Sequence, residues 1–283
     1  MASSILTNVG AMVALQTLNK TSKDLQTVQD RISTGMKVAT AKDNSSYWSI
    51  STVMKSDVSA LKALNENIAI NAATVQTARV GAENIQKLLS EVKNQLSLAT
   101  SASVDHAKVG DELNSLADNI QNTISSASYN GENLLDNGDT RTLTVSINRS
   151  GAAITAVTDT IDGQNMTAVQ TFVAGLAAAI TGGADGSANA AAAQTQLLAL
   201  EAHMDTVISA AAEFGNVGKR LDLQADFTSK LVDSLNEGIG TLVDANLNEE
   251  SARLQALQVQ QQLGIQALSI ANQSPQNILS LFR

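Results

Sequence analysis

Histidine and cysteine, the residue types most typical of catalytic and metal sites, are rare or absent in this chain, and no known catalytic motif places them at a functional spacing. The two histidines, His106 and His203, lie far apart, and neither belongs to an HExxH motif. The sequence has no phosphate-binding glycine loop and no nucleophile elbow. There is no cysteine, which excludes disulfides and thiolate metal sites. We expect His106 in a loop and His203 on a helix, and we expect no catalytic centre, no bound cofactor and no metal.

Two other short motifs have structural interpretations. The stretch GGADGS at 182–187 weakly resembles a calcium-binding repeat, but a single partial copy favours a simple loop. Tyr47 and Trp48 form the only adjacent aromatic pair. We expect this pair to anchor a crossing of helices in the core.

The composition indicates what kind of element carries these residues. Proline breaks helix interiors, and the chain has a single one, Pro275. The chain is 43% hydrophobic but only 2% aromatic, and it is rich in alanine, leucine, glutamine and serine. Alanine buries little area per residue, so the core must be thin. This composition favours a mainly α fold. Together with the patterns described below, it predicts an elongated antiparallel helical bundle or coiled coil with a small β-containing insert.

Charged residues are absent from both ends of the chain. Residues 1–19 and 254–282 carry no Lys, Arg, Asp or Glu. Both ends still show helical periodicity, with Leu18, Leu25 and Ile32 seven apart and Leu254 and Leu268 in one heptad phase. One interpretation is a flexible low-complexity tail. The periodic Leu and Ile favour the other, in which an uncharged polar face contacts neighbouring protein, because uncharged polar groups are buried at lower cost than charges.

The middle of the chain predicts long helices. From Leu61 to Ala99 a heptad repeat is nearly unbroken, with Asn71 as the polar exception, which predicts a helix about 60 Å long. A second helix is expected over 110–128 and a third over 188–214. A fourth is expected from Lys219 onward, after a joint at Gly215 and Gly218.

The central stretch, about 138–187, has a different pattern. Leu143, Val145 and Ile147 alternate with Thr and Ser, which predicts a strand, and Ser150-Gly151 predicts a hairpin turn into a second strand. Asn130-Gly131 and Asn137-Gly138 are turn dipeptides. We expect this region to be a small insert of strands and loop.

Charge and hydropathy bound the partners and the location. The net charge is −9, which argues against nucleic acid and anionic membrane as partners. The longest nearly apolar run, 173–180, is too short to span a bilayer. The N-terminus has no basic segment followed by an apolar one, so it is not a usual signal peptide. On these rules alone the chain would be cytoplasmic.

Two long motifs nevertheless resemble the terminal signatures of bacterial flagellins. Residues 24–51 read DLQTVQDRISTGMKVATAKDNSSYWSIS, and residues 242–283 read LVDANLNEESARLQALQVQQQLGIQALSIANQSPQNILSLFR. The signature positions are Arg31, Ser33, Gly35, Ala41, Lys42, Asp43, Asp244, Glu250, Ser251, Ala252, Gly264, Ala271, Asn272, Gln273 and Pro275.

The resemblance implies an extracellular subunit of the flagellar filament, exported unfolded by the flagellar type III apparatus, which overrides the cytoplasmic expectation. It implies a homo-oligomeric helical filament, possible sister flagellins, and an export chaperone, hook-junction proteins and a cap protein as partners. It also implies five segments: 1–40 and 244–283 in an inner coiled-coil layer, 41–137 and 188–243 in an outer rod, and 138–187 as a variable insert.

The same resemblance, with the charge-free ends, predicts which residues contact neighbouring subunits. We expect the last helix to be kinked or restarted at Pro275, with Ser274 as its cap. The expected interface residues on the terminal helices are Ile5, Val9, Met12, Leu18, Leu25, Ile32, Leu247, Leu254, Leu257, Leu263, Leu268, Ile278, Leu281 and Phe282.

Two alternatives stay open at this stage. A flagellar hook–filament junction protein shares both terminal signatures, although such proteins usually have a larger or less flagellin-like middle. A coiled-coil signalling or scaffold bundle would have ordered, charged ends, and the charge-free ends argue against it.

Overall fold

The computed structural model describes residues 8–136, 138–150 and 153–281, without the side chains of 150, 154 and 274–281. The chain divides into two compact units, a terminal unit (Met1–Val58 and Asp233–Arg283) and a middle unit (Ser59–Val232). Its described residues form mainly α-helices with two small antiparallel sheets. The predicted mainly α fold with a small β insert is therefore confirmed.

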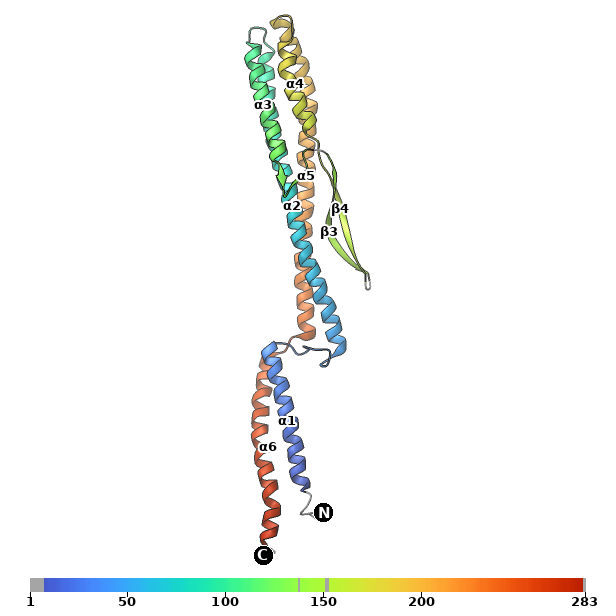
Figure 1. Cartoon of the computed structure of the whole chain (residues 1–283), viewed down its shortest axis with the longest axis vertical. Coiled ribbons are helices and arrows are strands. Elements are labelled where there is room, and N and C mark those ends of the chain that lie inside the picture. Colours follow the sequence, from blue (N-terminus) through green and yellow to red (C-terminus); the bar gives the residue numbers. More distant parts are fainter. Residues whose placement is uncertain (1–7, 137, 151–152, 282–283) are drawn as a thin grey trace. The chain divides into compact units, whose positions relative to one another are not determined.

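The terminal unit is built on two paired helices, α1 (Val9–Thr34) and α6 (Leu247–Leu281). The Asn8 side chain caps α1 by accepting a hydrogen bond from the Ala11 amide, and α1 ends at Gly35, whose φ is 71°. Glycine takes this left-handed conformation without steric cost. Figure 1 shows α1 and α6 side by side.

In the middle unit, α2 (Ser45–Ala99) lies antiparallel to α5 (Gly186–Val243). The contacts fix the register, since Lys93 pairs with Glu201 and Arg79 lies against Gly215. The apolar heptad positions of α2 between Leu61 and Ala99 are all buried. The predicted heptad helix is thus confirmed, and it begins earlier than the pattern alone indicated.

Helices α3 (His106–Ser126) and α4 (Thr167–Thr181) pack on each other in the same unit. The predicted stripe of Leu113, Leu116, Ile120 and Ile124 on α3 is buried. Helix α4 was not predicted, because 138–187 was expected to hold only strands and loop. Its buried side chains, Val169, Val173, Leu176, Ala177 and Ile180, belong to the core of the middle unit.

Two β-hairpins complete the middle unit. The short pair β1 (Ser128–Tyr129) and β2 (Glu132–Asn133) turns at Asn130-Gly131, whose φ angles are 52° and 83°. The longer pair is β3 (Thr140–Ser150) and β4 (Ala153–Asp162), antiparallel with Ser150 opposite Ala153. The predicted strands and the turn at Asn130-Gly131 are confirmed, whereas Gly151 of the Ser150-Gly151 turn and Asn137 of the Asn137-Gly138 turn lie outside the described residues. Arg220 on α5 pairs with Asp159 on β4 and so connects the hairpin to the helices. Figure 1 shows the two long strands β3 and β4 running side by side.

Three expectations about these elements are wrong. There is no joint at Gly215 and Gly218: α5 is continuous, because packing against Arg79 and Val75 of α2 outweighs a helix-interior glycine cost of about 1 kcal/mol each. Tyr47 and Trp48 do not anchor the core, since the buried face there runs through Ser51 and Val58.

The third concerns His106, which is not in a loop. It is the first residue of α3 and is buried, with its Nε2 atom 2.9 Å from the Ala99 carbonyl oxygen. Asp105 before it caps the helix by accepting from the amides of Ala107 and Lys108, which is why the helix begins there.

Candidate assembly interface

The two charge-free ends of the chain lie against each other in the terminal unit. Along α1 and α6 the contacts pair Arg31 with Glu250, Leu18 with Gly264, and Gly10 with Ala271. The numbers rise on one helix as they fall on the other, so the helices are antiparallel. The uncharged part of α1 therefore packs on the uncharged part of α6.

Six of the predicted interface residues face the partner helix within the chain. Leu257 is buried, and Leu18, Leu25, Ile32, Leu254 and Leu268 are half-buried. Residues seven apart recur on one face of a helix, which explains why the heptad phase selected this seam. These side chains hold α1 and α6 together.

Four other predicted residues point away from the seam. Val9, Met12, Leu247 and Leu263 are exposed, and Leu263 keeps 59% of its surface open. Sequence reasoning did not include in this set five further exposed apolar residues of the same helices: Val13, Leu15, Val259, Ile265 and Ile270. The signal that could have found the last three is an apolar residue outside the heptad phase on the charge-free part of a helix.

The remaining predicted interface residues cannot be placed in this way. Ile5 and Phe282 lie outside the described residues. Ile278 and Leu281 lie on the backbone of α6, and their side chains are outside the described part.

A hydrogen-bonded joint closes the pair where α1 leads into α2 and α5 leads into α6. The amides of Lys37 and Val38 donate to the Val243 carbonyl, and the Ala245 amide donates to the Gly35 carbonyl. Met36 and Asp244 form the bridge between these two linkers. The joint thus fixes the relative position of the two linkers, one of which carries Gly35.

Charged signature residues support this joint. Arg31 Nη1 lies 3.0 Å from Glu250 Oε1, and Glu250 is buried with its Oε2 atom unpartnered among the described residues. Asp43 accepts from the Ala39 and Thr40 amides and from the Thr40 hydroxyl. The Thr40 amide is the largest cause of the lowered pKa of the Asp43 carboxyl.

The other signature positions divide between the seam and the surface. Gly264 and Ala271 face α1. Exposed positions are Ser33, Ala41, Lys42, Asp244, Ser251, Ala252, Asn272 and Gln273. The signature therefore marks the joint and the seam, together with surface that the chain leaves open.

The expectation that the helix restarts at Pro275 is wrong, since α6 continues from Leu247 to Leu281, whereas the expected kink stays a prediction. A proline has no amide hydrogen, so the Ala271 carbonyl has no donor within the helix. The Asn8 side chain supplies one, with its Nδ2 atom 2.7 Å from that oxygen. An external donor makes the continuous helix tolerable.

The titratable residues in the described part of the chain are not gathered into a metal-binding cluster. No group of three or more His, Cys, Asp or Glu there could hold a metal. His203 stacks on Phe172 with ring centroids 4.2 Å apart, and burial lowers the pKa of His203. Within the same described range, no helix is long and apolar enough to cross a bilayer.

Helices paired along one face, with apolar side chains left exposed on their other faces, are typical of a helical subunit that binds further protein. Residues 5–140 match the N-terminal helical region of bacterial flagellin, and residues 197–282 match its C-terminal helical region. The chain belongs to the bacterial flagellin family, whose members are structural proteins. It is a subunit of the flagellar filament.

Relatives support this along the full length. The chain is 44% identical over 285 residues to a flagellin of Brucella melitensis biotype 1, covering 99% of both. It is 38% identical to flagellin FljK of Caulobacter vibrioides over 285 residues, covering 99% of this chain and 98% of the relative. It is 37% identical to flagellin C of Rhizobium meliloti over 318 residues, covering 99% of both.

A solved structure of a flagellar hook-associated protein from Vibrio parahaemolyticus shares the fold. Its TM-score is 0.57 at 18% identity, over 71% of this chain and 100% of that one. At this identity the likeness concerns the fold alone. The relatives named above are flagellins, and nothing favours the hook–filament junction alternative.

Proposed function

We propose that the exposed apolar residues on the charge-free parts of α1 and α6 carry the contacts between filament subunits. The observation behind this is that the pair has two kinds of face. One face of each helix is covered within the chain, and Val9, Met12 and Leu263 on the charge-free parts are exposed, as is Leu247 in the charged first turn of α6. Burying a leucine side chain stabilises an interface by about 1.5–3 kcal/mol. A neighbouring copy is the partner that a filament provides.

In this proposal the ends of the chain fold as they assemble. A thin pair of helices with few charges has little core of its own, so neighbours supply the missing contacts, and ordering and association become one event. A head-to-tail contact that does not close gives a filament. The paired helices α1 and α6 then present their exposed faces to the next subunit.

The proposed layers follow the joints of the chain. Segments 1–40 and 244–283 would form the inner coiled-coil layer, and 41–137 and 188–243 the outer rod, with 138–187 as the insert. The boundaries at 40 and 244 fall in the two linkers that the hydrogen-bonded joint holds together. Helix α4 lies inside the proposed insert, so only the β3–β4 part of that segment stands outside the helical core.

The setting of this function is also a proposal. The subunit would leave the cell unfolded through the flagellar type III apparatus, guided by an export chaperone, and join an extracellular filament between hook-junction and cap proteins. Sister flagellins could share that filament, because Caulobacter vibrioides alone has several flagellins among the relatives. An acidic chain of net charge −9 is a poor ligand for nucleic acid or anionic membrane.

Truncation tests the main contact surface. A chain without residues 254–283 should stay soluble and monomeric while α2 to α5 keep their helical circular dichroism. Polymerisation of this chain on filament seeds, measured by sedimentation and electron microscopy, would overturn the proposal.

A matched pair of substitutions tests the exposed face more finely. Leu263→Asn removes an exposed apolar side chain without adding charge, and we expect the critical concentration for polymerisation to rise about tenfold. Gln262→Asn, at the neighbouring exposed polar position, should leave it unchanged. Equal behaviour of the two variants would contradict the assignment of Leu263 to an interface.

A further inference from the structure

The start of α2 carries an exposed aromatic patch that the terminal helices do not explain. We define the aromatic patch as Tyr47, Trp48, Ile50 and Val53, each between 39% and 50% exposed. Tyr47, Ile50 and Val53 follow one another every third residue along α2, and Trp48 lies beside Tyr47, so the patch wraps around about half of the helix. Trp48 is the only tryptophan of the chain. Residues 44–54 carry no charge, which is the same feature that marks the assembling ends.

Such a patch is typical of a contact surface. Large apolar side chains grouped on the surface of a soluble protein mark interaction sites, and Trp and Tyr supply a large share of interface binding energy. Both aromatic rings also carry a hydrogen-bond donor that needs a partner when buried. A partner surface should therefore be concave, mostly uncharged, and supplied with acceptors.

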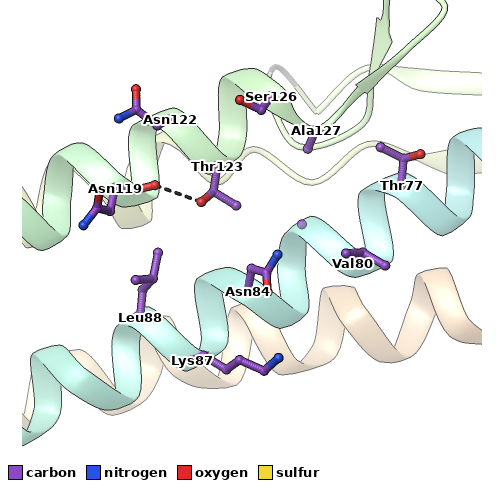
Figure 2. A pocket seen from close by; sticks show the side chains of 11 residues that line it. Thr77, Val80, Asn84, Lys87, Leu88, Asn119, Asn122, Thr123, Ser126 and Ala127 are labelled. Atoms are coloured by element: carbon purple, nitrogen blue, oxygen red, sulfur yellow. Dashed lines mark hydrogen bonds between the residues drawn. The ribbon is translucent and has the colours of Figure 1, made fainter.

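The middle unit has a groove of this kind between α2 and α3. It has a volume of about 660 Å³, and Figure 2 shows Asn84 and Leu88 of α2 and Asn119 and Thr123 of α3 lining it. Val80 adds an apolar side chain that is 42% exposed. Among the described residues that line the groove, Lys87 is the one charged side chain.

We propose that the aromatic patch of one copy docks in the α2–α3 groove of a second copy. This inference rests on the proposed function, because it needs neighbouring subunits. A protruding apolar patch and a pocket elsewhere on the same molecule make a heterologous contact that does not close, and such a contact propagates a fibre.

The chemistry of the two surfaces matches. The asparagine side chains of the groove offer amide oxygens to the Tyr47 hydroxyl and the Trp48 indole N–H. The Lys87 ammonium can lie over the indole ring, which is the aromatic ring that attracts cations best. The neutral patch brings no second charge that would have to be buried unpaired.

Tryptophan fluorescence of the unmodified protein tests whether the patch is buried. Because Trp48 is the only tryptophan, emission excited beyond the absorption of tyrosine reports this residue alone. On seeded polymerisation we expect the emission to shift to shorter wavelength and acrylamide quenching to fall severalfold. Filaments whose Trp48 is quenched as in the monomer would overturn this inference and leave the proposed function intact, whereas failure to form filaments would overturn the proposed function.

Introduced cysteines test whether the occupied site is the groove, since the chain has no cysteine of its own. Thr52→Cys lies one turn from Trp48 and keeps both aromatic rings. In assembled filaments it should form disulfide-linked multimers with Asn84→Cys or Asn119→Cys. It should not do so with Asn94→Cys or Asn114→Cys, exposed asparagines of the same two helices outside the groove.

The result of the crosslinking decides the partner. A ladder with the groove cysteines alone supports the proposal. Crosslinks at the control positions, or none at the groove in filaments with a protected Trp48, would show that the patch contacts another surface and would overturn the docking in the groove.

Discussion

The Asn8 side chain donates a hydrogen bond of 2.7 Å from Nδ2 to the carbonyl oxygen of Ala271, the acceptor that Pro275 leaves without a donor. The same amide accepts from the Ala11 N–H through Oδ1, so its two contacts fix its orientation. One side chain thus begins α1 and completes α6. Because Pro275 leaves the Ala271 carbonyl free to accept, a hydrogen bond from Asn8 connects the N-terminal helix to the C-terminal helix.

The first prediction is a coupling between positions 8 and 275. Asn8→Asp keeps the oxygen that caps α1 but cannot donate to Ala271, and we expect a loss of about 1 kcal/mol in the stability of the α1–α6 pair. In the background of Pro275→Ala, a backbone N–H fills the same carbonyl, so the added cost of Asn8→Asp should be smaller. The measurement is a double-mutant cycle on the heat stability of assembled filaments, and equal costs in both backgrounds would refute the coupling.

The second prediction concerns the Arg31–Glu250 ion pair. Glu250 is buried, so Arg31→Gln leaves an unpaired carboxylate and should destabilise the α1–α6 pair by about 1–3 kcal/mol. Arg31→Gln combined with Glu250→Gln removes the buried charge as well and should be less harmful than Arg31→Gln alone. Melting of filaments made from each variant provides the comparison, and a double variant weaker than Arg31→Gln would contradict it.

The third prediction compares one substitution at two helical glycines of the middle unit. A Cβ atom on Gly81 would lie 2.6 Å from Leu135 Cδ1 and 2.9 Å from Ala127 Cβ, so Gly81→Ala should cost about 1–3 kcal/mol. Gly175 on α4 has nothing within 4 Å of that position, so Gly175→Ala should stabilise by about 0.5–1 kcal/mol. Urea unfolding of the monomer gives both values. A Gly81→Ala variant that is as stable as the unmodified protein would show that the packing at Gly81 is not close, and a destabilised Gly175→Ala variant would contradict the open space at Gly175.

How far the sequence predicts this molecule depends on whether the deciding contact is local. The heptads of α2 were predictable because a helix buried along one side repeats every seven residues, and strand β3 because apolar and polar residues alternate along it. Helix α4 was missed because its apolar run with Gly175 has no polar face of clear period. Its burial on α3 decides its conformation, and no local pattern records that contact.

The errors at special residues have the same origin. Gly215 and Gly218 lie inside α5 because side chains of α2 pack on them, and Pro275 stays inside α6 because Asn8 supplies a distant donor. For the candidate site, the heptad phase found the residues of the α1–α6 seam. Val259, Ile265 and Ile270 lie outside that phase, and the phase alone does not say whether such residues are covered or left exposed.

The last prediction is a pH dependence of the middle unit through His203. Burial lowers the pKa of this histidine below its ordinary value of 6.5, so the folded state binds the proton less readily than the unfolded chain. The free energy of unfolding of the middle unit is therefore unaffected by protonation of His203 above about pH 6.5, where the ring is neutral in both states. It decreases as the pH falls below this value, because the unfolded chain binds the proton more readily. Glutamine does not titrate, so His203→Gln should remove this part of the decrease in unfolding free energy with falling pH. The variant also loses the ring stack on Phe172, which lowers stability equally at every pH. The measurement is the urea midpoint of the monomer between about pH 7.5 and about pH 5.5 for both proteins. A slope that is unchanged in His203→Gln would assign the acid sensitivity to other groups.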